Sequence, residues 1–402
     1  MKTAKILFLS FFILVFSFES ESQTASWTPL TSGTTQHLSS VSAINKDTVY
    51  VCGDSGTILK TINGGITWTP QSSGVTDNLI SMSFYDSNNG LIVYELGGFL
   101  VTTDGGTTWV QSGYPPFLRY IYFYNDSLGY AVGTSGTMYE INFGGGAWAP
   151  YAPDTSYQYN CVFLFSPQIY YVCGNGGLIR QTIDGGITWV TQTSGVSSSL
   201  NAIRFQSTTD GIAVGDTGVI LKTTNSGGIW TPVTAGTTDF LTGLDFIDAS
   251  QGFIVGGNVS SNTGSILETS NGGSTWTTSF PGSSRLTRVD MVNPNTGYAV
   301  GLDGTILKYT SNVGILENGN GSVLLNIFPN PAQNQITVEF SSFSTALLKI
   351  TNVLGQIVYS ETMENALGKQ NKNIDISAFS NGIYFVRIKN DKESISKKFI
   401  KE

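Results

Sequence analysis

Short runs of alternating apolar and polar residues recur along most of the chain, and the stretch from Leu200 to Trp230 shows them clearly. Leu200–Phe205 alternates, Gly211–Val214 is a run of small residues, and Val219–Thr223 is a third apolar run. Turn-forming Gly, Asp and Asn residues separate these runs, and a period of two between such turns predicts β-strands. With a further strand after Trp230, the stretch predicts four strands, which is one blade of a β-propeller.

Tryptophan marks the repeat of this unit. The gaps between successive tryptophans are 41, 41, 39, 41, 41 and 46 residues, and the series is Trp27, Trp68, Trp109, Trp148, Trp189, Trp230 and Trp276. A period of this length, built from short strands, is typical of propellers and similar arrays. We therefore expect an all-β fold in which a β-propeller spans residues 27–312.

The two ends of the repeat region complement each other. The last unit stops at Asn312 without a closing tryptophan, whereas Trp27 stands before any complete unit. A strand that begins at Trp27 can serve as the missing outer strand of the last blade, which joins the ends of the ring and removes a free sheet edge. Six Trp-to-Trp units and this closing unit predict seven blades.

A glycine-rich turn precedes most of the tryptophans. Four copies read TINGGITW (61–68), TTDGGTTW (102–109), TIDGGITW (182–189) and TSNGGSTW (269–276), and two degenerate copies end at Trp148 and Trp230. We expect the Asp or Asn side chain to accept hydrogen bonds from backbone N–H groups two residues on, while the paired glycines supply positive φ. Such a hairpin places the indole in the fourth strand, between neighbouring blades. The structural residues of this turn are then Asn63, Trp68, Asp104, Trp109, Asp184, Trp189, Asn271 and Trp276.

These turns resemble the Asp-box, also called the bacterial neuraminidase repeat, S/T-x-D-x-G-x-T-W. With the preceding GxxGtIlkT run, the unit is similar to the propeller repeats of the photosystem II stability/assembly factor family. The resemblance implies a propeller and little about function, because Asp-boxes lie on the outer rim and serve folding. In that family a basic surface contributes to recognition. Here the arginines of the propeller are dispersed along the sequence: Arg119, Arg180, Arg204, Arg285 and Arg288.

The composition changes after Asn312. A Gly/Asn-rich linker at 313–325 leads to alternating strands with turns at Asn330-Pro331, Leu354-Gly355 and Asn381-Gly382. This pattern predicts a small antiparallel, Ig-like β-sandwich over residues 326–402. The module is similar throughout to the C-terminal sorting domain of the type IX (Por) secretion system of Bacteroidota-type bacteria. The residues that match are Pro329, Asn330, Pro331, the NVLGQIV segment with Gly355, Gly382 with the strand after it, and Lys397 and Lys398 in the terminal KKFIK.

That resemblance implies an export route, and the other end of the chain agrees with it. Lys2 and Lys5 precede an apolar run from Ile6 to Phe18 that is too short to span a bilayer, so residues 1–22 read as a signal peptide. The signal peptide leads to the periplasm, and outer-membrane machinery then reads the sorting domain. We expect a protein that is secreted or held at the outer-membrane surface, with the type IX machinery as partner and no transmembrane segment in the mature chain.

Charge and composition exclude several functions. Residues 27–312 carry 9 Lys/Arg and 18 Asp/Glu, a net charge of −9, which disfavours binding to nucleic acid. Three cysteines and one histidine, His37, give no paired metal-ligand spacing, so we expect neither a metal nor a cofactor. Cys161 and Cys173 flank a predicted hairpin and can face each other; whether they form a disulfide stays open.

Catalytic signatures are scarce. A sialidase needs an arginine cluster, a Tyr–Glu pair and an acid/base Asp, and the N-terminal Arg-Ile-Pro signature of that family is missing. A glycanase with two acidic residues across the channel is harder to exclude because Asp is plentiful. Asp54, Glu95, Asp216 and Asp303 recur between the second and third strands of their units, where turn chemistry explains them. We therefore predict no catalytic residues.

A ligand would bind where the inter-blade loops surround one mouth of the channel. Two of these loops are unusually aromatic, and they supply the candidate ligand-binding residues Tyr114, Phe117, Arg119, Tyr120, Tyr157 and Tyr159. Exposed aromatic rings with an arginine suit a glycan or a protein ligand, although packing between blades explains aromatic residues as well. We expect a non-catalytic binding or scaffold protein. A polysaccharide-acting glycoside hydrolase and a photosystem-assembly-type chaperone are the alternatives.

Overall fold

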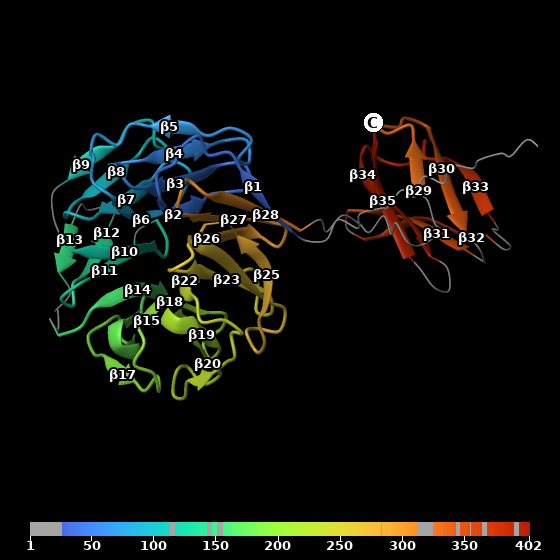
Figure 1. Ribbon diagram of the computed structural model, residues 1–402. Coiled ribbons are helices and arrows are strands. Elements are labelled where there is room, and N and C mark those ends of the chain that lie inside the picture. Colours follow the sequence, from blue (N-terminus) through green and yellow to red (C-terminus); the bar gives the residue numbers. More distant parts are fainter. Residues whose placement is uncertain are drawn as a thin grey trace, which may run out of the picture. The chain divides into compact units, whose positions relative to one another are not determined.

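The computed structural model of the chain divides into two compact units, Ala25–Ser311 and a second that holds Asn312–Glu402 (Figure 1). It describes residues 26–112, 117–126, 128–142, 147–150, 156–282, 284–311, 325–342, 346–353, 355–363, 368–389 and 394–402. The signal peptide expected at 1–22 lies outside the described residues. So does the linker expected at 313–325, except for Leu325, which opens a strand.

The described residues of the larger unit form seven four-stranded antiparallel sheets. Six of them take their strands in chain order: β2 (Leu38–Ala43), β3 (Val49–Gly53), β4 (Ile58–Thr61) and β5 (Thr69–Gln71); β6 (Leu79–Phe84), β7 (Gly90–Tyr94), β8 (Phe99–Thr102) and β9 (Val110–Ser112); β10 (Leu118–Phe123), β11 (Gly129–Gly133), β12 (Met138–Asn142) and β13 (Ala147–Pro150); β14 (Tyr159–Leu164), β15 (Tyr170–Gly174), β16 (Ile179–Thr182) and β17 (Val190–Gln192); β18 (Leu200–Phe205), β19 (Gly211–Gly215), β20 (Ile220–Thr223) and β21 (Thr231–Pro232); β22 (Phe240–Phe246), β23 (Gly252–Asn258), β24 (Thr263–Thr269) and β25 (Thr277–Gly282). Two short 3₁₀ turns, Asn175–Gly177 and Asp216–Gly218, join second and third strands.

The seventh sheet combines the two ends of this unit. Its order is β1 (Ser26–Leu30), β28 (Ile306–Thr310), β27 (Thr296–Gly301) and β26 (Leu286–Asn293). Trp27 lies opposite Tyr309 in the antiparallel register of β1 and β28. The indole is buried, and it packs against Phe253 of the preceding sheet with ring centroids 5.4 Å apart. This confirms the prediction that the strand at Trp27 completes the last sheet.

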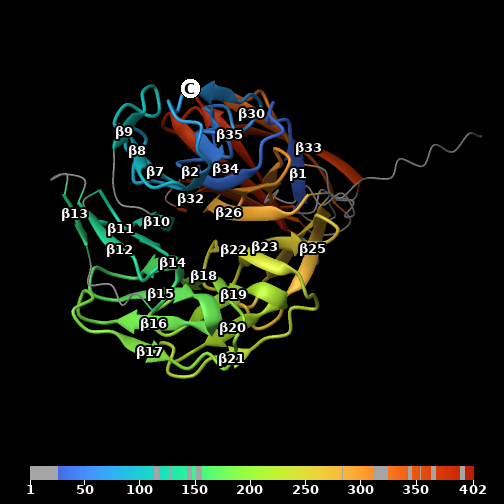
Figure 2. The same cartoon turned by 60° about the vertical axis from the view of Figure 1, so that its left-hand side comes forward.

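The first strand of each sheet contacts the first strand of the next, and β26 contacts β2. Figures 1 and 2 show these strands, β10, β14, β18 and β22 among them, around the middle of the unit. Side chains bond neighbouring first strands: the Met82, Ile121 and Phe123 N–H groups donate to the hydroxyls of Ser40, Ser81 and Ser83. The seven first strands therefore enclose a central channel.

Apolar residues fill the spaces between neighbouring sheets. One cluster combines Tyr50 and Ile58 of the first sheet with Leu79 and Ile92 of the second, and Trp109 packs against it. Tyr50 stacks on Phe84 at 4.1 Å, and Phe84 meets Trp109 edge-on at 5.9 Å. Of the predicted Asp-box indoles, Trp276 is buried, whereas Trp68, Trp109 and Trp189 are only partly buried.

The Asp-box turns follow one hydrogen-bond scheme, shown here for 182–189. The Thr182 hydroxyl donates to the Asp184 carboxylate at 2.8 Å and accepts from the Gly186 N–H at 2.7 Å. Asp184 accepts from the Thr188 N–H at 2.9 Å. The carboxylate therefore reaches four residues on, so the expected reach of two residues was wrong. The degenerate turn before Trp230 makes the same bonds through Thr223 and Asn225.

The described residues of the smaller unit form two antiparallel sheets. The first has the strand order β29 (Leu325–Phe328), β30 (Gln335–Ser342), β33 (Gly368–Asp375). The second has the strand order β32 (Ile357–Met363), β31 (Ala346–Asn352), β34 (Gly382–Lys389), β35 (Ser394–Lys401). Both sheets contribute to one buried cluster that includes Val338, Phe340, Ile350, Val386 and Phe399. The two sheets therefore share a core.

The motif residues of the predicted sorting domain stabilise this smaller unit. Pro329, Asn330 and Pro331 follow β29, and the Asn330 side chain accepts from the Ile400 N–H at 2.9 Å. Lys397 donates to the Leu325 carbonyl at 3.1 Å, and Lys398 is exposed. Gly355 has φ 78° in the turn after β31, and Gly382 opens β34. These motif residues lie at the connections and along the terminal strand.

The cysteines are free thiols in this structure. Cys161 and Cys173 are register partners on β14 and β15, so they face each other as the sequence suggests. The structure holds them as buried, reduced neighbours.

Candidate binding site at the channel mouth

A cavity of about 430 Å³ lies where the first strands begin. Its walls come from six of these strands, from the residue before β10 and from two turns between second and third strands: Ile80, Glu95, Phe117, Leu118, Arg119, Thr134, Asn160, Asn201, Thr242 and Arg288. We call it the mouth cavity. It combines apolar side chains, two guanidinium groups and two amides, a mixture that suits a ligand with both apolar and polar parts.

The predicted loop residues divide at this cavity. Phe117 and Arg119 line it, and Phe117 is 60% exposed with φ 71°. A positive φ is unusual for an aromatic residue and marks a specific backbone turn at this position of the loop. Tyr114 lies outside the described residues. Of the six candidates, Phe117 and Arg119 are the two that the structure places at the mouth cavity.

Tyr157 and Tyr159 lie together, near Arg180. The Arg180 guanidinium donates to the Tyr159 hydroxyl at 3.0 Å and lies over the Tyr157 ring, 4.8 Å from its centroid. The same guanidinium lies 5.5 Å from the centroid of Trp189. Tyr159 opens β14 and is buried, whereas Tyr157 lies two residues before the strand and is partly buried, and neither residue lines the mouth cavity.

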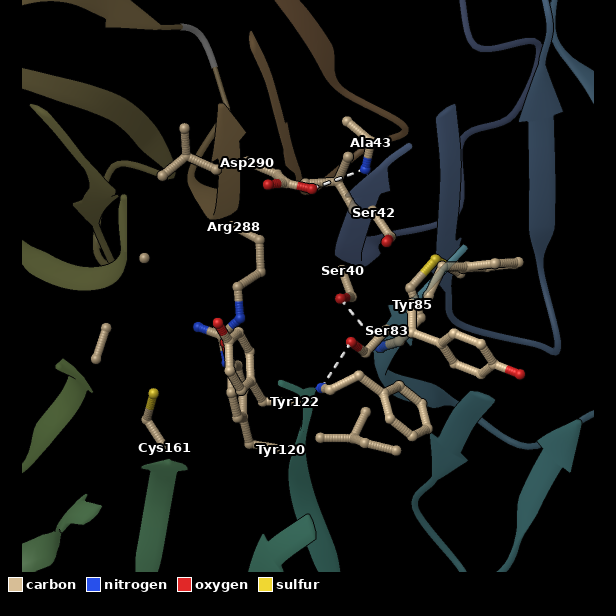
Figure 3. Close-up of a pocket in the computed structure, with 18 of the residues that line it drawn as sticks. Ser40, Ser42, Ala43, Ser83, Tyr85, Tyr120, Tyr122, Cys161, Arg288 and Asp290 are labelled. Atoms are coloured by element: carbon tan, nitrogen blue, oxygen red, sulfur yellow. Dashed lines mark hydrogen bonds between the residues drawn. The ribbon is translucent and has the colours of Figure 1, made fainter. Parts of the chain in front are cut away.

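A second cavity, of about 290 Å³, lies deeper along the channel (Figure 3). We call it the channel cavity. The first strands of all seven sheets line it, with Cys161 from β14 and Arg204 from β18 among the lining residues, and it reaches Ile44 and Asp86 beyond the ends of β2 and β6. Arg288 lines both cavities, so the two meet at its side chain. Tyr120, the remaining predicted residue, lines this cavity and is buried.

Arg204 is the central charge of the channel wall. It donates to the Tyr120 hydroxyl at 2.9 Å and lies 3.8 Å from an Asp245 carboxylate oxygen. Burial raises the pKa of Asp245, although Arg204 and the Met291 N–H oppose the rise. Cys161 lies 3.9 Å from the same guanidinium. Burial raises the pKa of this thiol, but the Cys173 hydrogen bond and Arg204 outweigh burial and lower the pKa to about 6.

Asp290 contributes a second carboxylate. It accepts from the Ala43 N–H at 2.7 Å, which connects the seventh sheet to the first. Burial, and next the charge of Asp245, raise the pKa of Asp290 to about 7. Arg204 therefore lies near two carboxylates and opposes the rise in the pKa of both Asp245 and Asp290.

The sequence did not single out Arg204, Asp245, Arg288 or Asp290 as a group. The signal that could have found them is one equivalent position in each of the repeated units. Register pairing puts seven residues at one equivalent place on the first strands, opposite residues 50, 91, 130, 171, 212, 253 and 298: Ser42, Ser83, Tyr122, Phe163, Arg204, Asp245 and Asp290. The residue at this equivalent place varies from Ser to Arg, while the strand pattern around it repeats from unit to unit. Such variation marks a position on the channel wall. Three of the five arginines that look dispersed in sequence, Arg119, Arg204 and Arg288, line the two cavities.

The other polar candidates have structural partners. The His37 imidazole accepts from the Asp303 N–H at 3.0 Å, and Glu95 accepts from the Asn78 amide at 2.9 Å. Asp216 accepts from the Asn201 amide at 2.7 Å. Within the part of the chain that the structure describes, no three His, Cys, Asp or Glu side chains gather as a metal site would require. These turn acids therefore serve the loops around the mouth.

Residues 326–402 match the secretion system C-terminal sorting domain. We call this segment the sorting module. Residues 19–118 match the family model of the photosynthesis system II assembly factor YCF48, which covers the first two sheets and the start of the third. A search of the curated proteins finds no match to the chain.

Solved structures with the same fold include two of YCF48. One is YCF48 bound to D1 peptide, at 21% identity and a TM-score of 0.60, covering 71% of this chain and 97% of that one. The other is YCF48 from Cyanidioschyzon merolae, at 18% identity and a TM-score of 0.60, covering 71% and 99%. PorZ, a surface component of the type-IX secretion system of Porphyromonas gingivalis, matches at 12% identity and a TM-score of 0.55, covering 90% of this chain and 59% of PorZ. These likenesses show a propeller-like β fold.

The helices in the described residues are short 3₁₀ turns, and a search of those residues finds none with the length and apolarity to cross a bilayer.

Proposed function

We propose that the chain is a non-catalytic binding protein, exported by the type IX secretion system to the cell surface or the medium. In this proposal residues 27–312 form a closed seven-bladed propeller, and the sorting module is a β-sandwich that the secretion machinery reads. The mouth cavity binds the ligand. The observation that carries the binding role is that Phe117 and Arg119 border a cavity of about 430 Å³ in which a second arginine, Arg288, also lies.

Export is supported by the match of residues 326–402 to a secretion sorting domain. It is tested by deleting Asn326–Glu402 in a bacterium that has this secretion system. We expect the truncated chain to stay in the periplasm while the full chain reaches the surface or the medium. The matched control is the full chain with the exposed Asn371 of β33, which lies outside the sorting motifs, replaced by Ala, and we expect its delivery to be normal. Normal delivery of the truncated chain would refute the export role.

The ligand class is a peptide or a glycan. Aromatic rings and guanidinium groups recognise both, through stacking and through bidentate hydrogen bonds. The similar structure of YCF48 is described as bound to D1 peptide, which supports the peptide for this chain. We therefore propose an extracellular protein or peptide as the first ligand to test.

The test is a peptide and glycan array probed with the full chain, with Phe117→Ala and Arg119→Ala variants in parallel. Both side chains are exposed, so the variants should fold normally. We expect a peptide signal that both variants lose. A signal that survives both changes would place the ligand elsewhere on the protein, and a blank array would contradict the binding role.

Hydrolysis of a polysaccharide is the enzymatic alternative, and one observation favours it. Asp245 and Asp290 face the same stretch of channel, and the pKa of Asp290 is raised to about 7, as a general acid requires. Each carboxylate, however, accepts a backbone N–H from the next first strand, which is a structural use. Hydrolysis of a panel of polysaccharides separates the catalytic role from the structural role. If Asp290 were catalytic, the unchanged chain would hydrolyse a substrate and Asp290→Asn would not. We expect no hydrolysis from the unchanged chain.

A further inference from the structure

The channel cavity holds opposite charges that do not pair with each other. Arg288 and Asp290 stand two residues apart on β26, so both project from the same face of the strand, into the channel. Among the described residues, neither side chain forms an ion pair. Figure 3 shows the Arg288 side chain extending away from Asp290, with the cavity beside both. Enclosed charges without a counter-charge are unfavourable.

Each group is held in place by neutral partners. Arg288 donates to the Thr242 carbonyl, and its guanidinium lies 5.0 Å from the centroid of the Tyr120 ring. Asp290 has the Ala43 N–H, while the nearby cation Arg204 already lies against Asp245. Arg288 and Asp290 therefore line the same cavity, and neither has an ion-pair partner among the described residues. The separation is set by the strand, at roughly 7 Å between the two Cα atoms.

Small polar and apolar side chains complete the wall. Ser40 and Ser83 each accept one backbone N–H, and their own O–H groups can still donate. Ser42 lies next to them on the wall, as Figure 3 shows, and has no hydrogen-bond partner for its side chain among the described residues. Met82, Ile121 and Leu244 add apolar surface. The site thus offers a cation, an anion, hydroxyl donors and an apolar wall in about 290 Å³.

We propose that the channel cavity binds a free α-amino acid with an apolar side chain, its carboxylate on Arg288 and its ammonium group on Asp290. A zwitterion of this kind supplies both missing counter-charges at once, which neither a carboxylic acid nor an amine does. An α-amino acid carries its carboxylate and its ammonium group on one carbon, so a single ligand can offer a charged hydrogen bond to each of the two side chains. Burial, and next the charge of Asp245, raise the pKa of Asp290, and a ligand ammonium group beside it would favour the charged form of the carboxyl group.

This site meets the proposed ligand site of the mouth at Arg288, and variants at Asp290 and at Phe117, each of which lines one cavity alone, distinguish the two sites. Calorimetry on the full chain compares L-leucine with two analogues that each lack one charge. 2-Hydroxy-4-methylpentanoate has no ammonium group, and 3-methylbutylamine has no carboxylate. We expect L-leucine to bind at least about tenfold more tightly than either analogue, because each loses one charged contact in an enclosed site.

Two variants then assign the ends of the ligand. Arg288→Gln should abolish the preference for L-leucine over 3-methylbutylamine and keep its preference over the hydroxy acid. Asp290→Asn should do the reverse. Arg180→Gln, whose side chain lies among Tyr157, Tyr159 and Trp189, is the matched control and should keep both preferences.

Failure is equally specific. The proposal is overturned if L-leucine does not bind at concentrations on the order of 10 mM, or if it binds no more tightly than both analogues. The three-ligand comparison on the unchanged chain decides this even if a channel variant fails to fold. Phe117→Ala should leave L-leucine binding unchanged, so a loss of the mouth ligand does not count against the channel site.

Discussion

The Asp290 carboxylate accepts a hydrogen bond from the backbone N–H of Ala43 at 2.7 Å, across 247 positions of sequence. The bond runs from β26 of the seventh sheet to β2 of the first. Asp245 makes the corresponding bond one sheet earlier, to the Met291 N–H at 2.8 Å. Serine hydroxyls do the same between the first three sheets. Side chains of the channel wall therefore hold neighbouring first strands in register.

Asp290 should make stability depend on pH in an unusual direction. Its pKa is raised to about 7 in the folded protein, first by burial and next by Asp245, against about 3.9 in an unfolded chain. The folded state then binds the proton more tightly, so this group's contribution to stability is lost as the pH rises from about 4 to about 7. The facing charges are Arg204, Asp245 and Arg288, and Tyr122 lies within the same wall.

Asp290→Asn keeps an acceptor for the Ala43 N–H and removes the titration. We expect the stability of the unchanged chain, relative to this variant, to fall by about 2–4 kcal/mol between pH 4 and pH 7. Urea unfolding at several pH values measures the difference. A difference that stays constant over this range would show that Asp290 titrates normally.

The hydroxyl of Thr182 should carry much of the stability of its Asp-box turn. It is buried and joins the Asp184 carboxylate to the Gly186 N–H. Thr182→Val keeps the shape and leaves that N–H without a partner, so we expect a loss of about 1–3 kcal/mol in urea unfolding. Thr182→Ser keeps the hydroxyl and is the control. Equal losses in the two variants would mean that packing matters here and the hydrogen bonds do not.

The indoles should differ in importance according to their burial. Trp276 is 7% exposed and packs in the cluster between the fifth and sixth chain-order sheets, with Ile212 and Ile254. Its replacement by Ala should reduce the free energy of unfolding by about 3–5 kcal/mol. Trp109 contacts Phe84 from a partly exposed place, so Trp109→Ala should reduce it less. The reverse order, measured by chemical denaturation, would contradict this packing.

The aromatic loop residues should separate into binding and packing groups. Arg119→Ser and Phe117→Ser alter exposed side chains, and we expect them to weaken ligand binding while unfolding changes by less than about 0.5 kcal/mol. Tyr159→Phe removes the partner of Arg180 inside the sheets, and it should destabilise by about 1 kcal/mol without affecting the ligand. Binding and unfolding measured on the same three variants test the division. A binding loss confined to Tyr159→Phe would reverse the assignment.

Local periodicity was enough to predict the elements. The alternation at Leu200–Phe205 matches β18 residue for residue, and the unpaired Trp27 is sufficient to predict the pairing of β1 with β28. Both inferences need only that strands alternate and that a free edge seeks a partner. The sequence predicted the right side chains for the Asp-box hydrogen bonds but the wrong spacing. The chain passes both glycines before the Thr188 N–H donates to the Asp184 carboxylate.

The channel wall could not be predicted in the same way. Tyr120 and Arg204 meet across 84 residues, and Arg288 lies over the Tyr120 ring from a still more distant strand. Within a single repeat each of these residues looks like an isolated polar substitution. Only the circular order of the first strands brings the equivalent places together. The sequence predicted Tyr157 and Tyr159 at the mouth because their loop is aromatic, whereas both contact Arg180 and neither lines the mouth cavity.

The pairing of β1 with β28 puts Ser26 directly opposite Thr310. The chain thus enters and leaves the larger unit at neighbouring points, and a short peptide could bridge them. A circular permutant that opens instead in an exposed segment between two sheets, for example beside Gly195 before β18, would carry β1 as an ordinary hairpin strand after β28. In the natural order, by contrast, the seventh sheet is complete only once residue 310 has been made, so about three-quarters of the 402-residue chain is synthesised before β1 can pair.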